Sequence, residues 1–268
     1  MQLPSNAFKA ALRAGRAQIG LWLGLADAYA SELFASTGFD WLGIDAEHAP
    51  NEPRNVLAQL QAIAAYPVHA VVRTTSGDAT LLKQYLDIGA QTVLIPMVES
   101  AEQAARIVAA TRYPPTGIRG VGSALARASR WNQVSNYLRD CEQEICVLVQ
   151  VESAVGLENL AGIAATEGVD GVFFGPADLA ASLGVLGKTG DARVQDAIAQ
   201  GIKMVRNAGK AAGVLSADPS VARQYLAAGA QFVAVGIDTT LLVRAARDLR
   251  AMFKDAGSTP PFSARGTS

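Results

Sequence analysis

The sequence predicts a single α/β domain folded as a (β/α)8 barrel, the TIM-barrel architecture. Eight short apolar runs recur along its 268 residues, and alanine- and leucine-rich segments with helical spacing separate them. The runs are continuously apolar rather than alternating, which is typical of parallel strands buried on both faces. An open doubly wound sheet is the alternative, but no Gly-x-Gly-x-x-Gly follows the first run. The expected strands are residues 19–23, 41–45, 69–73, 92–96, 146–152, 171–175, 212–216 and 232–236.

Helices are expected between these strands. Apolar residues recur at helical spacing in residues 51–65 and 78–88. Residues 85–91 (YLDIGAQ) and 225–231 (YLAAGAQ) repeat one pattern, in which a glycine suits a left-handed helix cap just before a strand. Further helix starts are expected at the capping residues Ser100, Asp218 and Asp238.

The domain boundaries follow from this rhythm. We expect the barrel to occupy residues 1–256 and a flexible tail, rich in Ser, Thr, Gly and Pro, to occupy 257–268. One connection, residues 111–140 between the fourth and fifth strands, is much longer than the others. Such a loop is typically functional; an oligomer contact is the alternative.

Composition excludes several functional classes. Hydrophobic residues make up 50% of the chain, and 23 basic side chains balance 24 acidic ones, so we expect no nucleic-acid partner. No apolar run is long enough to span a membrane, and the first residues lack a secretion-signal pattern. The two cysteines, Cys141 and Cys146, form no metal or redox motif. These features predict a cytoplasmic protein.

Two acidic residues end neighbouring strands. Glu152 closes the fifth strand, and Asp178 follows the sixth in Gly175-Pro-Ala-Asp. The carboxyl ends of the strands share one rim, where barrel enzymes carry their chemistry. An oxygen-only donor set favours a hard divalent ion such as Mg²⁺ or Mn²⁺. The alternatives are a helix N-cap for Asp178 and a surface salt bridge for Glu152.

Other polar residues stand at the same rim. His48 lies just past the second strand, beside Asp45 and Glu47, and is a candidate general base. An ordinary loop histidine is the alternative. Arg73 ends the third strand and offers a fixed positive charge for an oxyanion or a substrate carboxylate. His69 begins that strand at the opposite end, where we expect a structural role.

Absences narrow the chemistry further. None of the six lysines lies within or at the carboxyl end of a predicted strand, which argues against a Schiff-base aldolase and against pyridoxal phosphate. No Gly-x-Ser-x-Gly elbow and no P-loop is present, so we expect neither that hydrolase chemistry nor a nucleotide. Metal-assisted proton and carbon–carbon chemistry on a small oxyacid remains.

Four long motifs resemble a known family. They are FDWLGIDAEHAP (39–50), RGVGSALARASRW (119–131), VLVQVE (147–152) and GVFFGPAD (171–178). In this order they resemble the HpcH/HpaI aldolase family, and the resemblance runs from about Phe8 to Phe253. One residue departs from the family pattern: Ala46 stands where a glycine is usual.

The resemblance implies a (β/α)8 barrel, commonly hexameric, whose last helix is exchanged between subunits. It implies a class II aldolase that uses Mg²⁺, Mn²⁺ or Co²⁺ and reversibly cleaves 4-hydroxy-2-oxo acids into pyruvate and an aldehyde. For 4-hydroxy-2-oxoheptanedioate, the aldehyde is succinic semialdehyde. A 2-keto-3-deoxy sugar-acid aldolase of the glucarate or rhamnonate type is the alternative within the family.

Roles come with the resemblance, position by position. Glu152 and Asp178 would ligate the metal; Gln150, Ala177 and Asp178 would contact the substrate; Arg73 would stabilise the transition state; and His48 would be the general base. Asp87 matches the acid that the family pairs with the histidine, although our reading places it at the far end of a helix, away from the rim. Leu215 and the loop residues Arg119, Arg127 and Arg130 are candidates for shaping the aldehyde end.

The residues alone leave two other functional classes open. A metal-dependent mutase or hydrolase could use the same barrel. A catalytically inactive binding protein is the non-enzyme alternative. The joint presence of His48, Arg73, Glu152 and Asp178 favours an enzyme.

Overall fold

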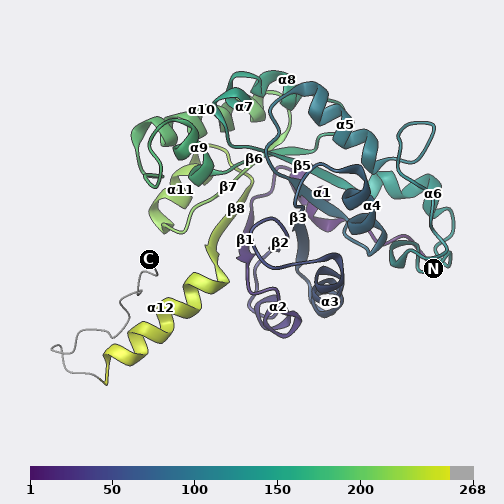
Figure 1. The fold of residues 1–268 in the computed structure, drawn as a ribbon, viewed down its shortest axis with the longest axis horizontal. Helices are drawn as coiled ribbons and strands as arrows, with labels where there is room; N and C mark the ends of the chain where they lie inside the picture. Colours follow the sequence, from purple (N-terminus) through teal and green to yellow (C-terminus); the bar gives the residue numbers. More distant parts are fainter. Residues whose placement is uncertain (254–268) are drawn as a thin grey trace, which may run out of the picture.

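The computed structural model describes residues 1–253 and confirms the predicted barrel. Eight parallel strands pair in chain order, and the first strand also pairs with the last, so the sheet closes on itself (Figure 1). The strands are β1 Gln18–Leu23, β2 Trp41–Asp45, β3 His69–Arg73, β4 Thr92–Ile95, β5 Cys146–Val151, β6 Gly171–Phe174, β7 Ala211–Leu215 and β8 Phe232–Ile237.

The chain also forms helices, most of which cover the outside of this barrel. They are α1 Ala7–Arg13, α2 Ala28–Ala35, α3 Pro53–Ile63, α4 Ala79–Asp87, α5 Ala101–Thr111, α6 Tyr137–Asp140, α7 Ala154–Glu158, α8 Leu160–Ala165, α9 Pro176–Ser182, α10 Ala192–Asn207, α11 Pro219–Ala227 and α12 Asp238–Ala251. Ser100 and Asp218 are N-caps, as predicted. The helix start predicted at Asp238 is confirmed, because α12 begins there, but the capping position is taken by Ile237. The buried Asp238 carboxylate instead accepts hydrogen bonds from the N–H groups of Gly24 and Leu25, and so ties α12 to the loop after β1.

The barrel interior is filled by side chains at every second strand position. Trp22, Trp41, Phe173 and Phe232 lie inside, with smaller residues such as Val71, Leu94 and Leu148. The rings contact one another at centroid distances of 5.6–6.3 Å. The side chains at the alternate strand positions point outward and pack against the helices in a second cluster, which includes Leu42, Val72, Val93 and Val172. This layering is typical of the architecture.

Glycines make room for the large rings. A Cβ on Gly20 would lie 2.1 Å from Cε2 of Trp41, and one on Gly213 would lie 2.2 Å from Cε2 of Phe232. Large and small residues therefore alternate around the interior, so that the aromatic layer fits a barrel of fixed diameter. This layer forms the floor on which the polar residues of the carboxyl rim rest.

Helix α1 closes the amino end of the barrel. Phe8 contacts Trp41 and Phe232 from below and stacks on the ring of His69 at 5.4 Å. Nε2 of His69 lies 2.8 Å from Oγ1 of Thr92, which also accepts a hydrogen bond from the Asn6 side chain. His69 therefore packs into the closed end of the barrel, consistent with the structural role expected for it.

The long connection of residues 111–140 is partly helical. It contains the 3₁₀ turn η1 Arg127–Ser129 and helix α6, and a second 3₁₀ turn, η2 Cys141–Glu144, follows it. At the other end of the chain, α12 extends away from the barrel (Figure 1). The predicted tail, residues 257–268, lies outside the described residues. Among residues 1–253, no helix combines the length and the apolarity that crossing a bilayer requires.

His69 makes stability pH-dependent. Burial lowers its pKa from the ordinary 6.5 to about 4, although the residue keeps some exposure. As pH falls from 6.5 to 4, the unfolded chain binds a proton that the folded chain does not, so this contribution is intact above pH 6.5 and lost below. The loss amounts to about 3 kcal/mol over that window. The free energy of unfolding of the His69→Gln variant, measured by urea denaturation, should depend that much less on pH between 4 and 6.5 than that of the wild type. Equal pH dependence in the two proteins would contradict this assignment.

Candidate active site at the carboxyl end of the barrel

The inward parity of the strands continues into a polar layer at the carboxyl rim. Arg73 lies two residues after Val71, Asp45 lies four after Trp41, and Gln150 and Glu152 lie two and four after Leu148. All four share the inward parity of those interior residues, and all four are buried. Their exposed fractions are only 2–8%. Side chains from three different strands are therefore gathered above the aromatic floor.

Arg73 is held by an ion pair across two neighbouring strands. The register of β2 and β3 places Asp45 directly opposite Arg73. Nε and Nη2 of Arg73 donate to the two carboxylate oxygens of Asp45 at 3.0 and 2.7 Å. Nη1 lies 2.8 Å from Oε2 of Glu47, and the guanidinium carbon sits 4.8 Å from the Trp22 ring centroid. The planar fork is fixed on three sides.

The charge of Arg73 keeps Asp45 ionised. Burial by itself would raise the pKa of Asp45, but the hydrogen bonds and positive charge of Arg73 hold it below the usual range. The N–H groups of Trp22 and Glu47 also donate to this carboxylate, at 3.2 and 2.9 Å. Asp45 thus acts as the anchor of the arginine rather than as a free acid.

A chain of buried amides fixes the loop that carries His48. Asn51 donates to the backbone oxygen of Asp45 at 2.6 Å, and Gln59 donates to Asn51 at 2.7 Å. Ser31 in turn donates to Gln59 at 3.0 Å. The side chain of His48 is 67% exposed, and its Nε2 lies 3.9 Å from Oε2 of Glu47. The imidazole is accessible at the rim beside a carboxylate.

Glu152 is a buried carboxylate without a cationic partner among the described residues. It accepts hydrogen bonds from the Met97 N–H, at 3.0 Å, and from the Gln150 amide. Burial raises its pKa to about 7, and the negative charges of Asp178 and Glu47 add to the rise. The alternative of a surface salt bridge is wrong, since Glu152 is only 2% exposed.

The start of α9 packs against Glu152. A Cβ on Gly175 would lie 2.2 Å from Oε2 of Glu152 and 2.8 Å from Nε2 of Gln150, so only glycine fits there. Gly175 is the N-cap of α9, so the alternative N-cap role for Asp178 is wrong. Asp178 lies exposed in the first turn, next to the exposed Ala177.

The rim carries more negative than positive charge. Asp45 and Glu47 pair with Arg73, whereas Glu152 and Asp178 form no ion pair among the described residues. The negative charge of Asp178 raises the pKa values of both Glu47 and Glu152. Gln150 adds a buried amide oxygen with no hydrogen-bond donor in the described chain. Such a set of oxygens fits a hard divalent cation. No group of three His, Cys, Asp or Glu side chains within residues 1–253 could hold a metal, so a cation here would also need water or substrate oxygens.

Some predicted residues lie elsewhere. Asp87 ends α4, which runs back toward the amino end of the barrel, and it pairs with Arg119 at 2.6 Å. The expected pairing of Asp87 with His48 is therefore not formed within this chain. Arg119 is buried over Tyr113, and Arg127 donates to the backbone oxygen of Ile88. Both arginines thus contact the amino-end side, whereas Leu215 is half-buried at the end of β7.

Three features of the site were not predicted from the sequence. Trp22 was visible only as part of an apolar strand. Met97 supplies a backbone N–H from a left-handed conformation (φ 55°), for which its side chain gives no signal. The pairing of Asp45 with Arg73 could have been found, because both residues end adjacent strands at equal length.

Removing the anchor of Arg73 should cost considerable stability. The Asp45→Ala variant leaves a buried guanidinium with its main partner missing, and we expect a loss of about 3 kcal/mol in the free energy of unfolding. Asp140→Ala, which breaks the exposed pair with Arg139, should cost less than about 1 kcal/mol. Urea denaturation measures both. Equal losses would show that Asp45 is not an anchor.

The chain is similar to curated aldolases over nearly its whole length. It is 66% identical to a hydroxypyruvate/pyruvate aldolase of Deinococcus radiodurans over 251 residues, which cover 94% of this chain and 91% of that protein. It is 59% identical to a 4-hydroxy-2-oxo-heptane-1,7-dioate aldolase of Salmonella heidelberg over 248 residues, covering 92% and 94%. The expected heptanedioate substrate thus appears in the name of the second relative, whereas the first is named for hydroxypyruvate and pyruvate.

Solved structures and a family model agree with this similarity. A crystal structure of a HpcH/HpaI aldolase/citrate lyase family protein from Burkholderia cenocepacia superposes with a TM-score of 0.90 at 41% identity, covering 94% of this chain and all of that one. The model of the HpcH/HpaI aldolase/citrate lyase family matches residues 18–245. The chain therefore belongs to this family, as its motifs predicted, and it is an aldolase, a carbon–carbon lyase.

Proposed function

We propose that this aldolase is a divalent-metal-dependent pyruvate aldolase, which reversibly cleaves 4-hydroxy-2-oxo acids into pyruvate and an aldehyde. Hydroxypyruvate is proposed as a second donor in the synthetic direction, because relatives named for both donors are up to 66% identical to this chain. Succinic semialdehyde, the product expected from the heptanedioate, is proposed among the acceptors, as are the aldehydes of 2-keto-3-deoxy sugar acids.

The observation that carries the proposal is the buried Glu152 carboxylate. It faces other acids and meets no cation from the described chain, an arrangement that costs free energy unless a cation or a proton compensates it. Glu152 and Asp178 would hold a divalent ion such as Mg²⁺, Mn²⁺ or Co²⁺. When bound, such an ion supplies Lewis-acid polarisation of the 2-oxo group and positive charge opposite a developing enolate.

Arg73 fits the role of transition-state stabiliser. Two of its nitrogens are fixed by Asp45 and its plane rests near Trp22, so its remaining N–H groups are oriented before substrate arrives. Hydrogen-bond donors that are already in place where negative charge develops stabilise the transition state most strongly when water is excluded from the site. The first turn of α9 leaves backbone N–H groups without helical partners. We place the substrate carboxylate there, near Ala177 and Asp178, with Gln150 beside it.

His48 is proposed as the group that moves the proton. Its exposed imidazole takes the proton from the 4-hydroxyl group, the C3–C4 bond breaks, and the aldehyde leaves. The electron pair of that bond passes to the pyruvyl half as an enolate, which regains a proton at C3 to give pyruvate. Leu215, half-buried at the same rim, is placed at the aldehyde end.

The assembly is proposed to be a homo-hexamer in which α12 packs against another copy. Within the described chain, α12 and the residues after it expose the apolar side chains Leu242, Val243, Leu249, Met252 and Phe253. Exposed apolar groups of this number on one projecting helix are typical of an interface.

Product analysis tests the reaction. Incubation with 4-hydroxy-2-oxoheptanedioate and Mg²⁺ or Mn²⁺ should release free pyruvate and succinic semialdehyde in equal amounts, and exhaustive EDTA treatment should abolish the release. Synthetic assays with pyruvate or hydroxypyruvate and a panel of aldehydes, compared by kcat/KM, rank the substrates. The His48→Ala variant serves as the inactive control. Consumption of the acid without pyruvate, or full activity after chelation, would overturn the proposal.

The Gly175→Ala variant tests the metal site without relying on turnover. Its added methyl group must displace the Glu152 carboxylate, so Mn²⁺ affinity measured by electron paramagnetic resonance should fall at least about tenfold. Gly24→Ala is the matched control. It adds the same methyl group at the same rim, where the nearest atom is 3.5 Å away. Unchanged Mn²⁺ affinity in Gly175→Ala would remove Glu152 from the ligand set.

A further inference from the structure

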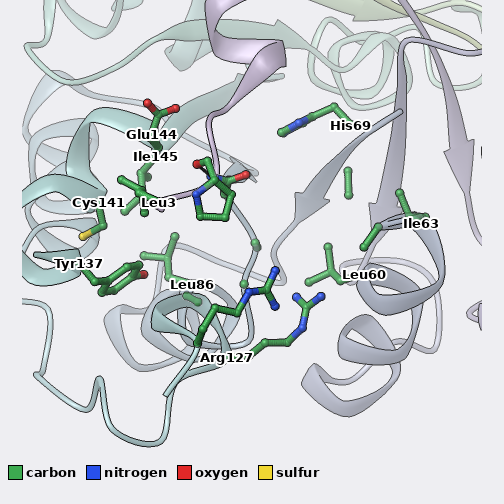
Figure 2. A pocket seen from close by; sticks show the side chains of 18 of the residues that line it. Leu3, Leu60, Ile63, His69, Leu86, Arg127, Tyr137, Cys141, Glu144 and Ile145 are labelled. Atoms are coloured by element: carbon green, nitrogen blue, oxygen red, sulfur yellow. Dashed lines mark hydrogen bonds between the residues drawn. The ribbon is translucent and has the colours of Figure 1, made fainter. Parts of the chain in front are cut away.

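A separate cavity of about 270 Å³ opens at the amino end of the barrel, away from the catalytic rim. It lies between α3, α4, the long connection and the first residues of the chain, and Figure 2 shows Arg127 beside Leu86 and Leu60, with Glu144 and His69 farther off in the view. None of the residues proposed for catalysis lines it. The size suits a small molecule rather than a chain segment.

Two arginines line this cavity together. Arg127 and Arg130 lie near enough that the charge of Arg130, after the larger effect of burial, lowers the pKa of Arg127. Both side chains are half-buried, and neither guanidinium has a carboxylate within 4 Å among residues 1–253, whereas Arg73, Arg112 and Arg119 are each paired with one. Two like charges held together without a counter-ion cost free energy, which a bound anion would recover.

The backbone around the pair keeps it in place. Nη1 of Arg127 donates to the backbone oxygen of Ile88 at 3.1 Å, which leaves its other N–H groups for a ligand. A Cβ on Gly89 would lie 2.6 Å from that Nη1, so the glycine makes room for the guanidinium. Arg130 has a left-handed backbone (φ 52°), a strained conformation for a residue with a side chain.

The remaining walls select the kind of anion. Leu60, Ile63, Val68 and Leu86 give the cavity an apolar side, which a hydrated inorganic anion would not use. Glu144 contributes a carboxylate to the lining, which disfavours a ligand with two or more negative charges. A single negative charge on a short hydrocarbon body satisfies both the arginines and the apolar wall.

We propose that this cavity is a binding site for a small monocarboxylate, whose carboxylate pairs with Arg127 and Arg130 and whose hydrocarbon chain packs on Leu60, Ile63 and Leu86. The site is distinct from the aldolase site at the opposite end of the barrel. Guanidinium groups bind carboxylates through paired hydrogen bonds, which fixes the head group, and the apolar wall sets the preference for chain length.

Calorimetric titration of the full-length wild-type protein with sodium hexanoate tests the site. We expect saturable binding, with acetate at least tenfold weaker because it lacks the chain. Hexylammonium, which carries the same chain with the opposite charge, should not bind. Absence of hexanoate binding, or equal binding of hexylammonium, would overturn the proposal.

Variants place the binding in this cavity. Arg130→Gln should weaken hexanoate at least tenfold, and its side chain donates no hydrogen bond within the described residues, so the fold should tolerate it. The Arg127→Gln/Arg130→Gln double variant should abolish binding. Arg193→Gln, at an exposed pair on α10, is the matched control and should bind like the wild type. Hexanoate binding that is unchanged in Arg130→Gln would locate it elsewhere and contradict the assignment.

Discussion

A closed barrel of eight parallel strands forces every second side chain into one enclosed volume, and this constraint organises the whole molecule. In the lower layers the volume is filled by Trp22, Trp41, Phe173 and Phe232, with glycines opposite the largest rings. In the uppermost layer the same parity brings Asp45, Arg73 and Glu152 above that floor. Packing and chemistry are thus consecutive layers of one alternation, and the rigid aromatic layer supports the polar one.

The polar layer carries an excess of negative charge. The negative charge of Asp45 is neutralised by its ion pair with Arg73, and Glu47 lies against the same guanidinium group. Glu152 and Asp178 are left without a cation from the described chain. A site of this kind repels an oxyacid substrate until positive charge is added. The proposed metal and the fixed arginine therefore have separate tasks. The metal would neutralise the acidic side chains, and Arg73 would orient the substrate.

The two ends of the barrel differ in what they do. At the amino end, α1 inserts Phe8 under the aromatic layer, and the Asn6–Thr92–His69 contacts seal the closure. The long connection returns to this end and fixes Arg119 on Asp87. Because that face has no part in the proposed chemistry, a cavity there can take a ligand without blocking the substrate. Separation of stability and function between the two ends is typical of these barrels.

The sequence by itself determined the strands, the barrel and the types of residue at its rim, because continuous apolar runs and their polar ends depend on local pattern. It also determined the family, through four motifs in order. Only the tertiary structure decided that the Asp45 carboxylate pairs with the Arg73 side chain, that Asp87 lies away from His48, and that Glu152 is enclosed by the Met97 N–H and by Gly175. A backbone N–H and a missing side chain leave no mark in a sequence pattern. Their effect arises only when distant segments come within a few ångströms of one another.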